Sequence, residues 1–235
     1  SRLSLVRDAT YLITGGLGGL GLVVARWLVE RGARHLVLVS RRGVTPARQA
    51  ALQTLEELGA CITVLQADVA DAAQVADVLS QIKRAHPPLR GIIHAAGVVE
   101  DGVLQQMTWA RFATVLAPKM LGAWHLHKLT HTEPLDFFVL FSSLTSLIGT
   151  AGQANYAAAN AFLDGLAHHR RAQQLPALSI NWGAWATVGM AAERQLESYL
   201  AQRGLDLIAP EQGLRLLEQL MVRDPIQIGV APIVW

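Results

Sequence analysis

Short runs of Val, Ile and Leu alternate along the chain with longer stretches whose apolar residues recur at helical spacing, and this alternation constrains the fold most. The runs cover Tyr11–Thr14, His35–Ser40, Cys61–Ala67, Gly91–Ala95, Phe137–Ser142, Ala177–Asn181 and Ile226–Ala231. Each is apolar nearly throughout, as in a strand buried on both faces of a sheet. Because strands that alternate with helices form right-handed βαβ units, the pattern predicts an α/β fold, a doubly wound parallel sheet of about seven strands with helices on both faces.

The stretches expected to be helical lie between these runs. They cover Leu20–Arg31, Pro46–Leu58, Ala73–Ala85, Met120–Thr130, Tyr156–Gln173 and Pro210–Val222. Residues 186–205 contain no apolar run of their own, and Gly189 with the polar stretch Glu193–Gln202 is typical of a mobile cover, so we expect a lid there. No linker or repeat divides the chain, and residues 1–235 are therefore predicted to form a single domain.

The composition excludes several classes of protein. Hydrophobic residues make up 51% of the chain and charged residues 16%, which is incompatible with disorder, yet no apolar stretch is long and uninterrupted enough for a membrane span. The formal net charge is only +2 and the basic residues are scattered, so nucleic acid is not an expected partner. A single cysteine, Cys61, allows no internal disulfide and no cysteine-based metal site. We therefore expect a cytoplasmic protein without a bound metal.

A glycine-rich turn follows the first predicted strand and leads into the first predicted helix. It comprises residues 14–21, Thr-Gly-Gly-Leu-Gly-Gly-Leu-Gly. Glycines at such a turn allow a pyrophosphate to approach the backbone, where the free N–H groups and the positive end of the helix dipole meet its charge. The alternative is a flexible turn that only packs a helix on a strand. The position of the turn between strand and helix favours a dinucleotide site.

The end of the second predicted strand bears on which dinucleotide would bind. A site for an unmodified ribose has Asp or Glu there, whereas this sequence has Ser40 and Arg41, a hydroxyl and a guanidinium suited to a 2′-phosphate. NADPH is therefore expected rather than NADH, unless Arg41 is only a solvated loop residue. After the third strand, Asp68 and Val69 could contact a ring edge, and after the fourth, residues 95–97 (Ala-Ala-Gly) could admit a flat ligand. Either segment could also be a simple turn.

A hydroxyl, a phenol and a lysine suggest proton transfer. Ser143 follows the fifth predicted strand, Tyr156 begins a helix, and Asn160 lies four residues later on the same helix face. A phenol with a pKa near 10 can donate a proton to a developing alkoxide if a nearby cation stabilises its ionised form. Lys119 is the candidate cation, being one of only three lysines. Taken singly, Tyr156 could be an aromatic residue at the edge of the core, Ser143 a strand-end cap and Asn160 part of a polar helix face.

Together these motifs resemble the short-chain dehydrogenase/reductase superfamily, and specifically the ketoreductase domains of modular polyketide synthases. The matching segments are TGGLGGLG at 14–21, SRRG at 40–43, HAAG at 94–97, PKMLGAWHL at 118–126, YAAAN at 156–160 and NWGAW at 181–185. The resemblance implies that Tyr156 donates the proton, that Ser143 holds the carbonyl oxygen, and that Lys119 and Asn160 complete a catalytic tetrad. In most of the superfamily a lysine stands at the position of Asn160, whereas polyketide ketoreductases carry it upstream, as here.

A Rossmann-type fold and NADPH as cofactor are further implications of the resemblance. The residues expected to contact NADPH are Thr14, Gly15, Gly16, Leu17, Gly18, Gly19, Leu20, Ser40, Arg41, Asp68, Val69, Ala95, Ala96, Gly97, Lys119, Tyr156, Trp182 and Gly183. The expected reaction is reduction of a β-ketoacyl thioester, carried by phosphopantetheine on an acyl carrier domain, and neighbouring synthase domains are the other expected partners. The alternatives are a catalytically silent cofactor-binding module and a free-standing short-chain reductase.

The resemblance also bears on stereochemistry. One class of these domains has Leu-Asp-Asp after the HAAG segment, and here residues 99–101 read Val-Glu-Asp and keep the final Asp101. The opposite class has Trp eight residues before the tyrosine, where this chain has Ile148, and the epimerising subtype has Pro where this chain has Ala158. We therefore expect the first class, B-type, giving a D-configured alcohol without epimerisation, with Asp101 as a stereocontrol residue.

One feature departs from the resemblance. Complete ketoreductases of this kind usually carry a second, cofactor-less Rossmann-like subdomain before the glycine turn, but here the turn begins with Thr14. The chain also starts with Ser1 rather than Met. We therefore expect a fragment of a larger multidomain synthase from which the N-terminal structural subdomain is absent.

Overall fold

The computed structural model describes residues 3–189 and 204–233. Their central element is one seven-stranded sheet, in which all neighbouring strands are parallel and the order is β3-β2-β1-β4-β5-β6-β7. The strands are β1 (Thr10–Thr14), β2 (His35–Ser40), β3 (Cys61–Gln66), β4 (Leu89–His94), β5 (Phe137–Ser143), β6 (Leu178–Trp182) and β7 (Gln227–Val230). The predicted doubly wound Rossmann-type sheet is thus confirmed, with each strand within two residues of its expected position.

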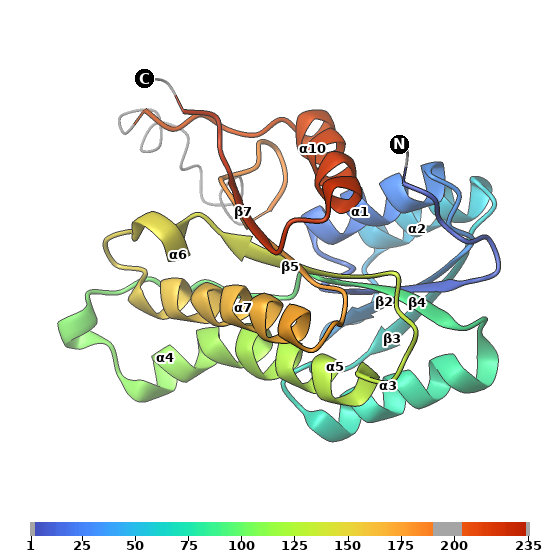
Figure 1. Cartoon of the computed structure of the whole chain (residues 1–235), viewed down its shortest axis with the longest axis horizontal. Coiled ribbons are helices and arrows are strands. Elements are labelled where there is room, and N and C mark those ends of the chain that lie inside the picture. Colours follow the sequence, from blue (N-terminus) through green and yellow to red (C-terminus); the bar gives the residue numbers. More distant parts are fainter. Residues whose placement is uncertain (1–2, 190–203, 234–235) are drawn as a thin grey trace.

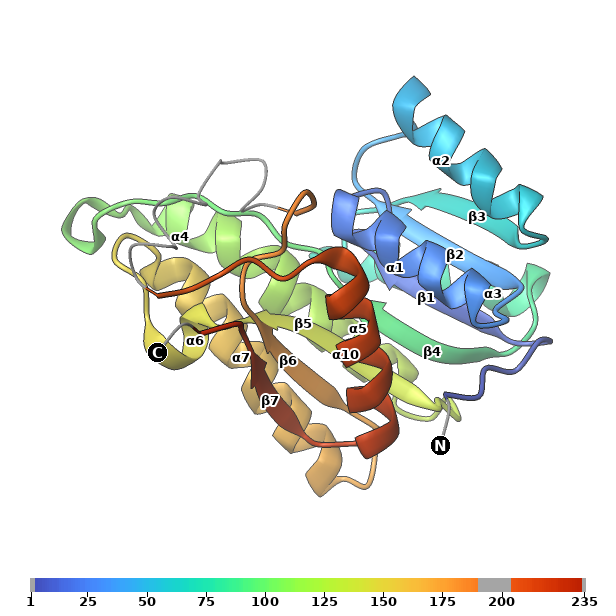
Figure 2. The ribbon, with the colours of Figure 1, turned by 90° about the horizontal axis from the view of Figure 1, so that it is seen from above.

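Helices cover both faces of the sheet (Figure 1 and Figure 2). On one face lie α1 (Gly19–Glu30), α2 (Pro46–Glu57) and α10 (Pro210–Arg223). On the other lie α3 (Ala72–Ala85), α4 (Trp109–Leu116), α5 (Gly122–Thr130) and α7 (Ala154–Ala172). The short α6 (Thr145–Ile148) follows β5 directly and packs against α7. None of the described helices has the length and apolar character that a bilayer crossing requires.

The segment between β4 and β5 contains more helix than the sequence predicted. The helix expected over Met120–Thr130 is only the end of a longer helical stretch, which starts with α4 and passes through a π-helical turn, η2 (Ala117–Leu121), into α5. A 3-10 turn, η1 (Leu104–Gln106), precedes α4. Of the expected lid, residues 190–203, including the polar stretch Glu193–Gln202, lie outside the described residues.

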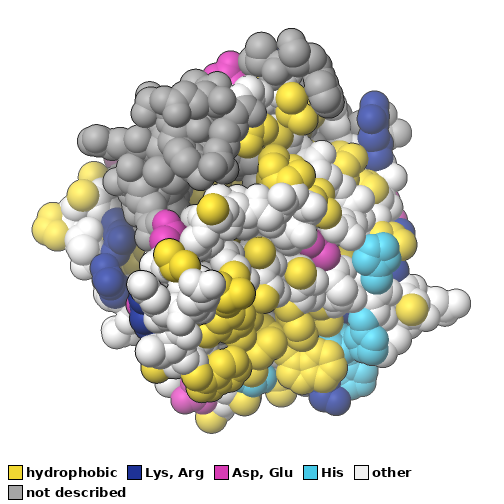
Figure 3. Space-filling model, turned by 90° about the vertical axis from the view of Figure 1, so that its left-hand side faces the viewer, with side chains coloured by type: hydrophobic (Ala, Val, Ile, Leu, Met, Phe, Trp, Pro, Cys, Tyr) yellow, Lys and Arg dark blue, Asp and Glu magenta, His cyan; other side chains and the backbone are white. Residues whose placement is uncertain are grey.

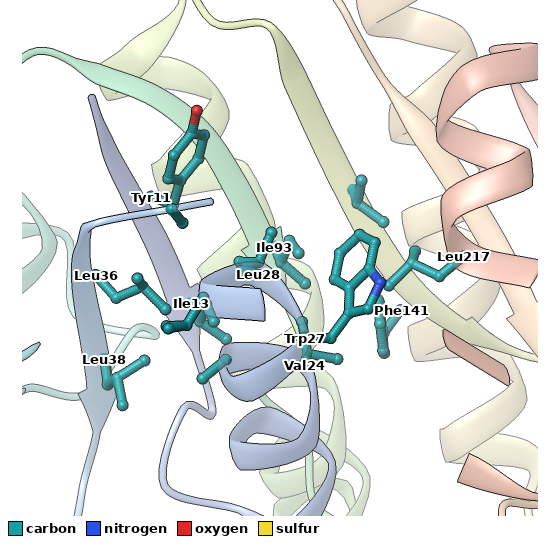
Figure 4. Close-up of a cluster of buried hydrophobic side chains, with 14 of the residues drawn as sticks. Tyr11, Ile13, Val24, Trp27, Leu28, Leu36, Leu38, Ile93, Phe141 and Leu217 are labelled. Atoms are coloured by element: carbon teal, nitrogen blue, oxygen red, sulfur yellow. The ribbon is translucent and has the colours of Figure 1, made fainter. Parts of the chain in front are cut away.

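The larger of the two main core clusters lies between the sheet and the helices α1 and α10 (Figure 4). Trp27 of α1 extends between Phe141 of β5 and Leu217 of α10, and it ties the two helices to the middle of the sheet. The second cluster fills the opposite face, where Phe138 of β5 packs with Leu163 of α7. Each such side chain contributes roughly 1.5–3 kcal/mol when fully buried, so the two clusters fix the strand ends that carry the site.

The glycine turn is held by close backbone packing. Gly15 has a φ of +69°, in the region that favours glycine, and the amide of Gly16 donates to the carbonyl oxygen of Val39 on β2 at 3.1 Å. A Cβ atom on Gly21 would overlap the carbonyl oxygen of Gly15. The turn therefore requires glycine for its own geometry, in addition to any ligand it binds.

This packing predicts that Gly21→Ala is destabilising. The added methyl group must displace the turn, so we expect the free energy of unfolding to fall by about 2 kcal/mol or more, as for other overpacked sites. Gly43→Ala is the matched control, because its Cβ atom would meet nothing within 4 Å and should change stability by less than about 0.5 kcal/mol. Urea denaturation of both variants checks this, and equal stabilities would refute the packing argument.

Candidate active site

A cavity of about 460 Å³ opens at the carboxyl ends of the central strands. Four of the predicted functional residues line it, namely Ser143, Tyr156, Lys119 and Asp101. The cavity is also lined by Leu20, Ala95, Trp182 and Gly183, which the sequence analysis assigned to the cofactor. Residues from the glycine turn, β4, β5, β6 and α7 thus meet in one space, where ligands bind in open α/β sheets.

Lys119 is buried, with 3% of its surface exposed. It projects from the π-helical turn η2, and its Nζ donates to the carbonyl oxygen of Phe141 at 2.8 Å. A Cβ atom on Gly97 would lie 2.9 Å from Cε of Lys119, so a larger residue there would displace the lysine. The Nζ atom lies 5.6 Å from the centre of the Tyr156 ring, within the range of a cation–π interaction.

The charge on Lys119 is sensitive to its surroundings. Burial lowers the pKa of Lys119 to about 7, and the carboxylate of Asp164 opposes this shift. A lysine with such a pKa exists in both protonation states near neutral pH. Its Nζ lies close enough to the Tyr156 ring for its charge to act on the phenol.

Ser143 ends β5 and presents its side chain to the cavity. Its Oγ lies 3.1 Å from Oγ1 of Thr145 and accepts from the Thr145 amide at 3.2 Å, which fixes the hydroxyl at the start of α6. Tyr156 lies in the first turn of α7. Because Ser143 and Tyr156 line the same cavity, one ligand oxygen could reach both.

Asn160 occupies a different place from the other three members of the predicted tetrad. It is fully buried, does not line the cavity, and its Nδ2 donates to the carbonyl oxygen of Tyr156 at 2.8 Å. Its buried Oδ1 has no hydrogen-bond partner among the described residues. Asn160 therefore lies behind Tyr156, away from the cavity.

The glycine turn suits a pyrophosphate. Helix α1 begins with Gly18 as its N-cap, without a side-chain cap and without an acidic residue in its first turn, so its first N–H groups are available to an anion. A Cβ atom on Gly19 would lie 3.5 Å from the backbone nitrogen of Gly189 and 3.7 Å from Cβ of Val188, so residues 188–189 pack directly over the start of α1. Leu17, in contrast, is buried in the core, and only its backbone could contact a cofactor.

The remaining predicted cofactor residues lie outside the cavity. Arg41 is exposed after β2, and its carbonyl oxygen accepts from Nε2 of Gln66. One carboxylate oxygen of Asp68 accepts from the Ala70 amide at 2.9 Å, so it also stabilises its own turn. The others in this group are Ser40, Val69, Ala96 and Gly97.

Several lining residues were missed by the sequence analysis. Trp185 packs edge-on against Trp182 with ring centres 5.0 Å apart, and Phe141 and Val188 complete this apolar wall. The matching segment NWGAW pointed to this region, but only Trp182 and Gly183 were assigned to the site. Ile148 also lines the cavity and is 63% exposed. Hydrophobic side chains gather over part of the molecular face that Figure 3 shows.

His94 is a second residue whose role the sequence did not show. It ends β4, is fully buried, and its Nδ1 lies 2.7 Å from the hydroxyl of Thr14 at the end of β1. It also packs against the position of Gly122, just after η2. Burial and, to a smaller extent, the charge of Lys119 together lower the pKa of His94 to about 3, and backbone groups of Lys119 and Pro118 oppose the shift. His94 thus links the glycine turn to the segment that carries Lys119.

The low pKa of His94 predicts acid sensitivity. Between pH 6.5, its ordinary pKa, and pH 3, the unfolded chain binds a proton that the folded chain excludes, so stability falls as the pH falls through this window. His94→Asn keeps an acceptor for Thr14 and removes the titration. We expect its melting temperature to fall less than that of the unmodified protein between pH 7 and about pH 4.5. Parallel losses of stability in the two proteins would show that His94 does not titrate in this way.

The sequence of the chain matches a known protein family and several known proteins. The family model of the KR domain matches residues 9–187. The spectinabilin polyketide synthase system protein NorB of Streptomyces orinoci is 48% identical over 92% of the chain, and the phenolphthiocerol synthesis polyketide synthase type I Pks15/1 of Mycobacterium marinum is 43% identical over 94%. The chain spans only 10% and 11% of the lengths of these two relatives.

Solved ketoreductase structures are similar to this chain along its whole length. A structure of A-type ketoreductases from a modular polyketide synthase aligns with the whole chain with a TM-score of 0.94 at 39% identity. The ketoreductase from the first module of phoslactomycin biosynthesis in Streptomyces sp. HK803 does so with a TM-score of 0.93 at 37% identity. The chain covers 50% and 55% of these two structures.

Fold and site together define an oxidoreductase-like Rossmann domain of the short-chain dehydrogenase/reductase type. Within that class, the chain belongs to the KR family, the ketoreductase domains of polyketide synthases.

Proposed function

We propose that the domain reduces a β-ketoacyl thioester to the β-hydroxyacyl thioester with NADPH. The observation that carries this proposal is the meeting of Ser143, Tyr156 and Lys119 at one cavity, directly beside the glycine turn. A proton donor, a hydrogen-bond donor and a buried cation in one cavity are what reduction of a carbonyl group needs from the protein. NADPH would supply the hydride when bound.

Each residue has a distinct part in this chemistry. The hydroxyl of Ser143 donates a hydrogen bond to the substrate carbonyl oxygen and orients it, and the phenol of Tyr156 donates the proton that the oxygen takes up. The ammonium of Lys119 lowers the free energy of the phenolate that remains. Asn160 keeps the first turn of α7 in place through its bond to the carbonyl oxygen of Tyr156.

The same cavity suggests how the substrate arrives. Its apolar wall of Phe141, Trp182 and Trp185 suits an acyl chain, and its open mouth suits a chain delivered on a flexible arm. We infer that the arm is the phosphopantetheine of an acyl carrier domain and that neighbouring synthase domains supply and receive the chain. The relatives described above, which are polyketide synthases many times longer than this chain, support this inference.

Stereocontrol is assigned to the segment around Asp101. Nε2 of Gln153 donates to the Asp101 carboxylate at 3.0 Å, and Nδ2 of Asn155 donates to the carbonyl oxygen of Glu100 at 2.9 Å, so this segment is fastened to the residues just before Tyr156. Asp101 and Ile148 both line the cavity, where they would limit the entry of the acyl chain. We propose the B-type outcome, a D-configured alcohol without epimerisation.

Replacing the proton donor tests the proposed reaction. We expect Tyr156→Phe to retain NADPH binding and to lose about 10²-fold or more in reduction of a β-ketoacyl thioester mimic, followed by the loss of cofactor absorbance. Tyr11→Phe is the matched control, because Tyr11 is buried in the core and its hydroxyl bonds to Val6, away from the cavity. Activity of Tyr156→Phe within about threefold of the unmodified protein would remove Tyr156 from the mechanism.

Cofactor preference should depend on Arg41. We expect Arg41→Ala to weaken NADPH binding by about 1.5–3 kcal/mol, the contribution of a hydrogen bond to a charged group, and to leave NADH binding nearly unchanged. Calorimetric titration with both cofactors measures this. The control is Arg84→Ala, an exposed arginine on α3. An equal loss for both cofactors would assign Arg41 a purely structural role.

A further inference from the structure

Asp164 is the one acidic side chain in the buried set of the described residues, with 7% of its surface exposed. Burial of a carboxylate is costly unless hydrogen bonds and opposite charge compensate. Three donors surround it. Oδ1 lies 2.6 Å from Oγ of Ser179, and Oδ2 lies 2.8 Å from both Oγ of Ser146 and Nδ2 of Asn181. The carboxylate is therefore fully engaged inside the protein.

These contacts connect Asp164 to the end of β5. Oγ of Ser146 lies 2.8 Å from Asp164 and 2.9 Å from the carbonyl oxygen of Ser143, so its single proton bonds to one of these oxygens at a time, and it accepts from Nδ2 of Asn181 at 2.7 Å. Nδ2 of Asn181 lies 3.1 Å from Oγ of Ser142, which in turn donates to the carbonyl oxygen of Asn160. Asp164 thus holds α6, β6 and the strand end that carries Ser143 in one hydrogen-bonded network.

Asp164 also shares a helix face with the residues of the site. It lies four residues after Asn160 and eight after Tyr156 on α7. The ionisable groups around Lys119 are Asp164 and Tyr156 from α7 and His94 from β4. Of these, only Asp164 raises the pKa of Lys119 against the effect of burial.

We propose that Asp164 is a positioning residue, whose buried carboxylate fixes the end of β5 next to Ser143 and supplies a negative charge to the Lys119 side of the site. This inference deepens the proposed reductase function and rests on it for its catalytic meaning. Asp164 does not line the cavity, so its effect passes through Asn181 and Ser146 to the end of β5 and through the electric field to Lys119.

Nuclear magnetic resonance of lysine side chains tests the charge directly. The chain has three lysines, Lys83, Lys119 and Lys128, so labelled lysine gives three resonances, and Lys119→Met identifies the one of interest. We expect Asp164→Asn, which keeps the shape of the side chain, to shift the titration midpoint of Lys119 to lower pH by about one pH unit or more. An unchanged midpoint in folded Asp164→Asn would overturn the proposal.

Ser179→Ala is the matched control, because it removes one hydrogen bond of the same carboxylate and retains the charge. We expect it to lower the melting temperature and to leave the Lys119 midpoint in place. A midpoint shift as large as that of Asp164→Asn would show that loss of structure, rather than of charge, causes the effect. Because this readout needs no turnover, an inactive domain with a shifted midpoint would refute the reductase function and leave the role of Asp164 standing.

If Asp164→Asn does not fold, Ser146→Ala is measured instead, because it removes the hydroxyl that lies between the Asp164 carboxylate and the carbonyl oxygen of Ser143. We expect kcat to fall about tenfold in this variant through misplacement of the Ser143 hydroxyl, and by less than about threefold in Ser179→Ala. Equal kcat values in the two variants would overturn the positioning role.

Discussion

The hydrogen bond from the buried ammonium of Lys119 to the carbonyl oxygen of Phe141 is the interaction on which the site depends. It joins the turn η2 to the middle of the sheet, and it holds a cation where little water reaches. Gly97 leaves room for the lysine, and His94 stays neutral beside it. Burial disfavours this charge, and the carboxylate of Asp164 opposes that effect in part.

The sheet topology explains why the cofactor site and the proton donor meet. Strand β1 lies between β2 and β4. The chain runs from β1 outward through β2 and β3 on one side and continues with β4 and β5 on the other, and a crevice opens at the carboxyl ends of the strands where the order reverses. The glycine turn after β1 borders one side of this crevice, and Ser143 after β5 borders the other. Helix α7 then returns across the sheet and presents Tyr156 between them.

Much of this arrangement could be predicted from the sequence, because it depends on local patterns. Buried parallel strands are continuous apolar runs, and Ser143 and Tyr156 stand where a predicted strand ends and a predicted helix begins. Helix α4 was missed although Val115 and Leu116 are buried, because its eight residues are too short a stretch to show a clear helical period. The place of Asn160 behind Tyr156 and the network of Asp164 depend on contacts between distant segments, which no local pattern encodes.

Transfer of deuterium tests the reductase assignment most directly. The domain is supplied with NADPH that carries deuterium at its hydride-donating position and with a β-ketoacyl thioester, and the product is analysed by mass spectrometry and chiral chromatography. The expected result is a D-configured β-hydroxyacyl thioester with deuterium on the β-carbon. An unreduced thioester, under conditions in which cofactor binding is demonstrated, would contradict the account and identify a catalytically silent module.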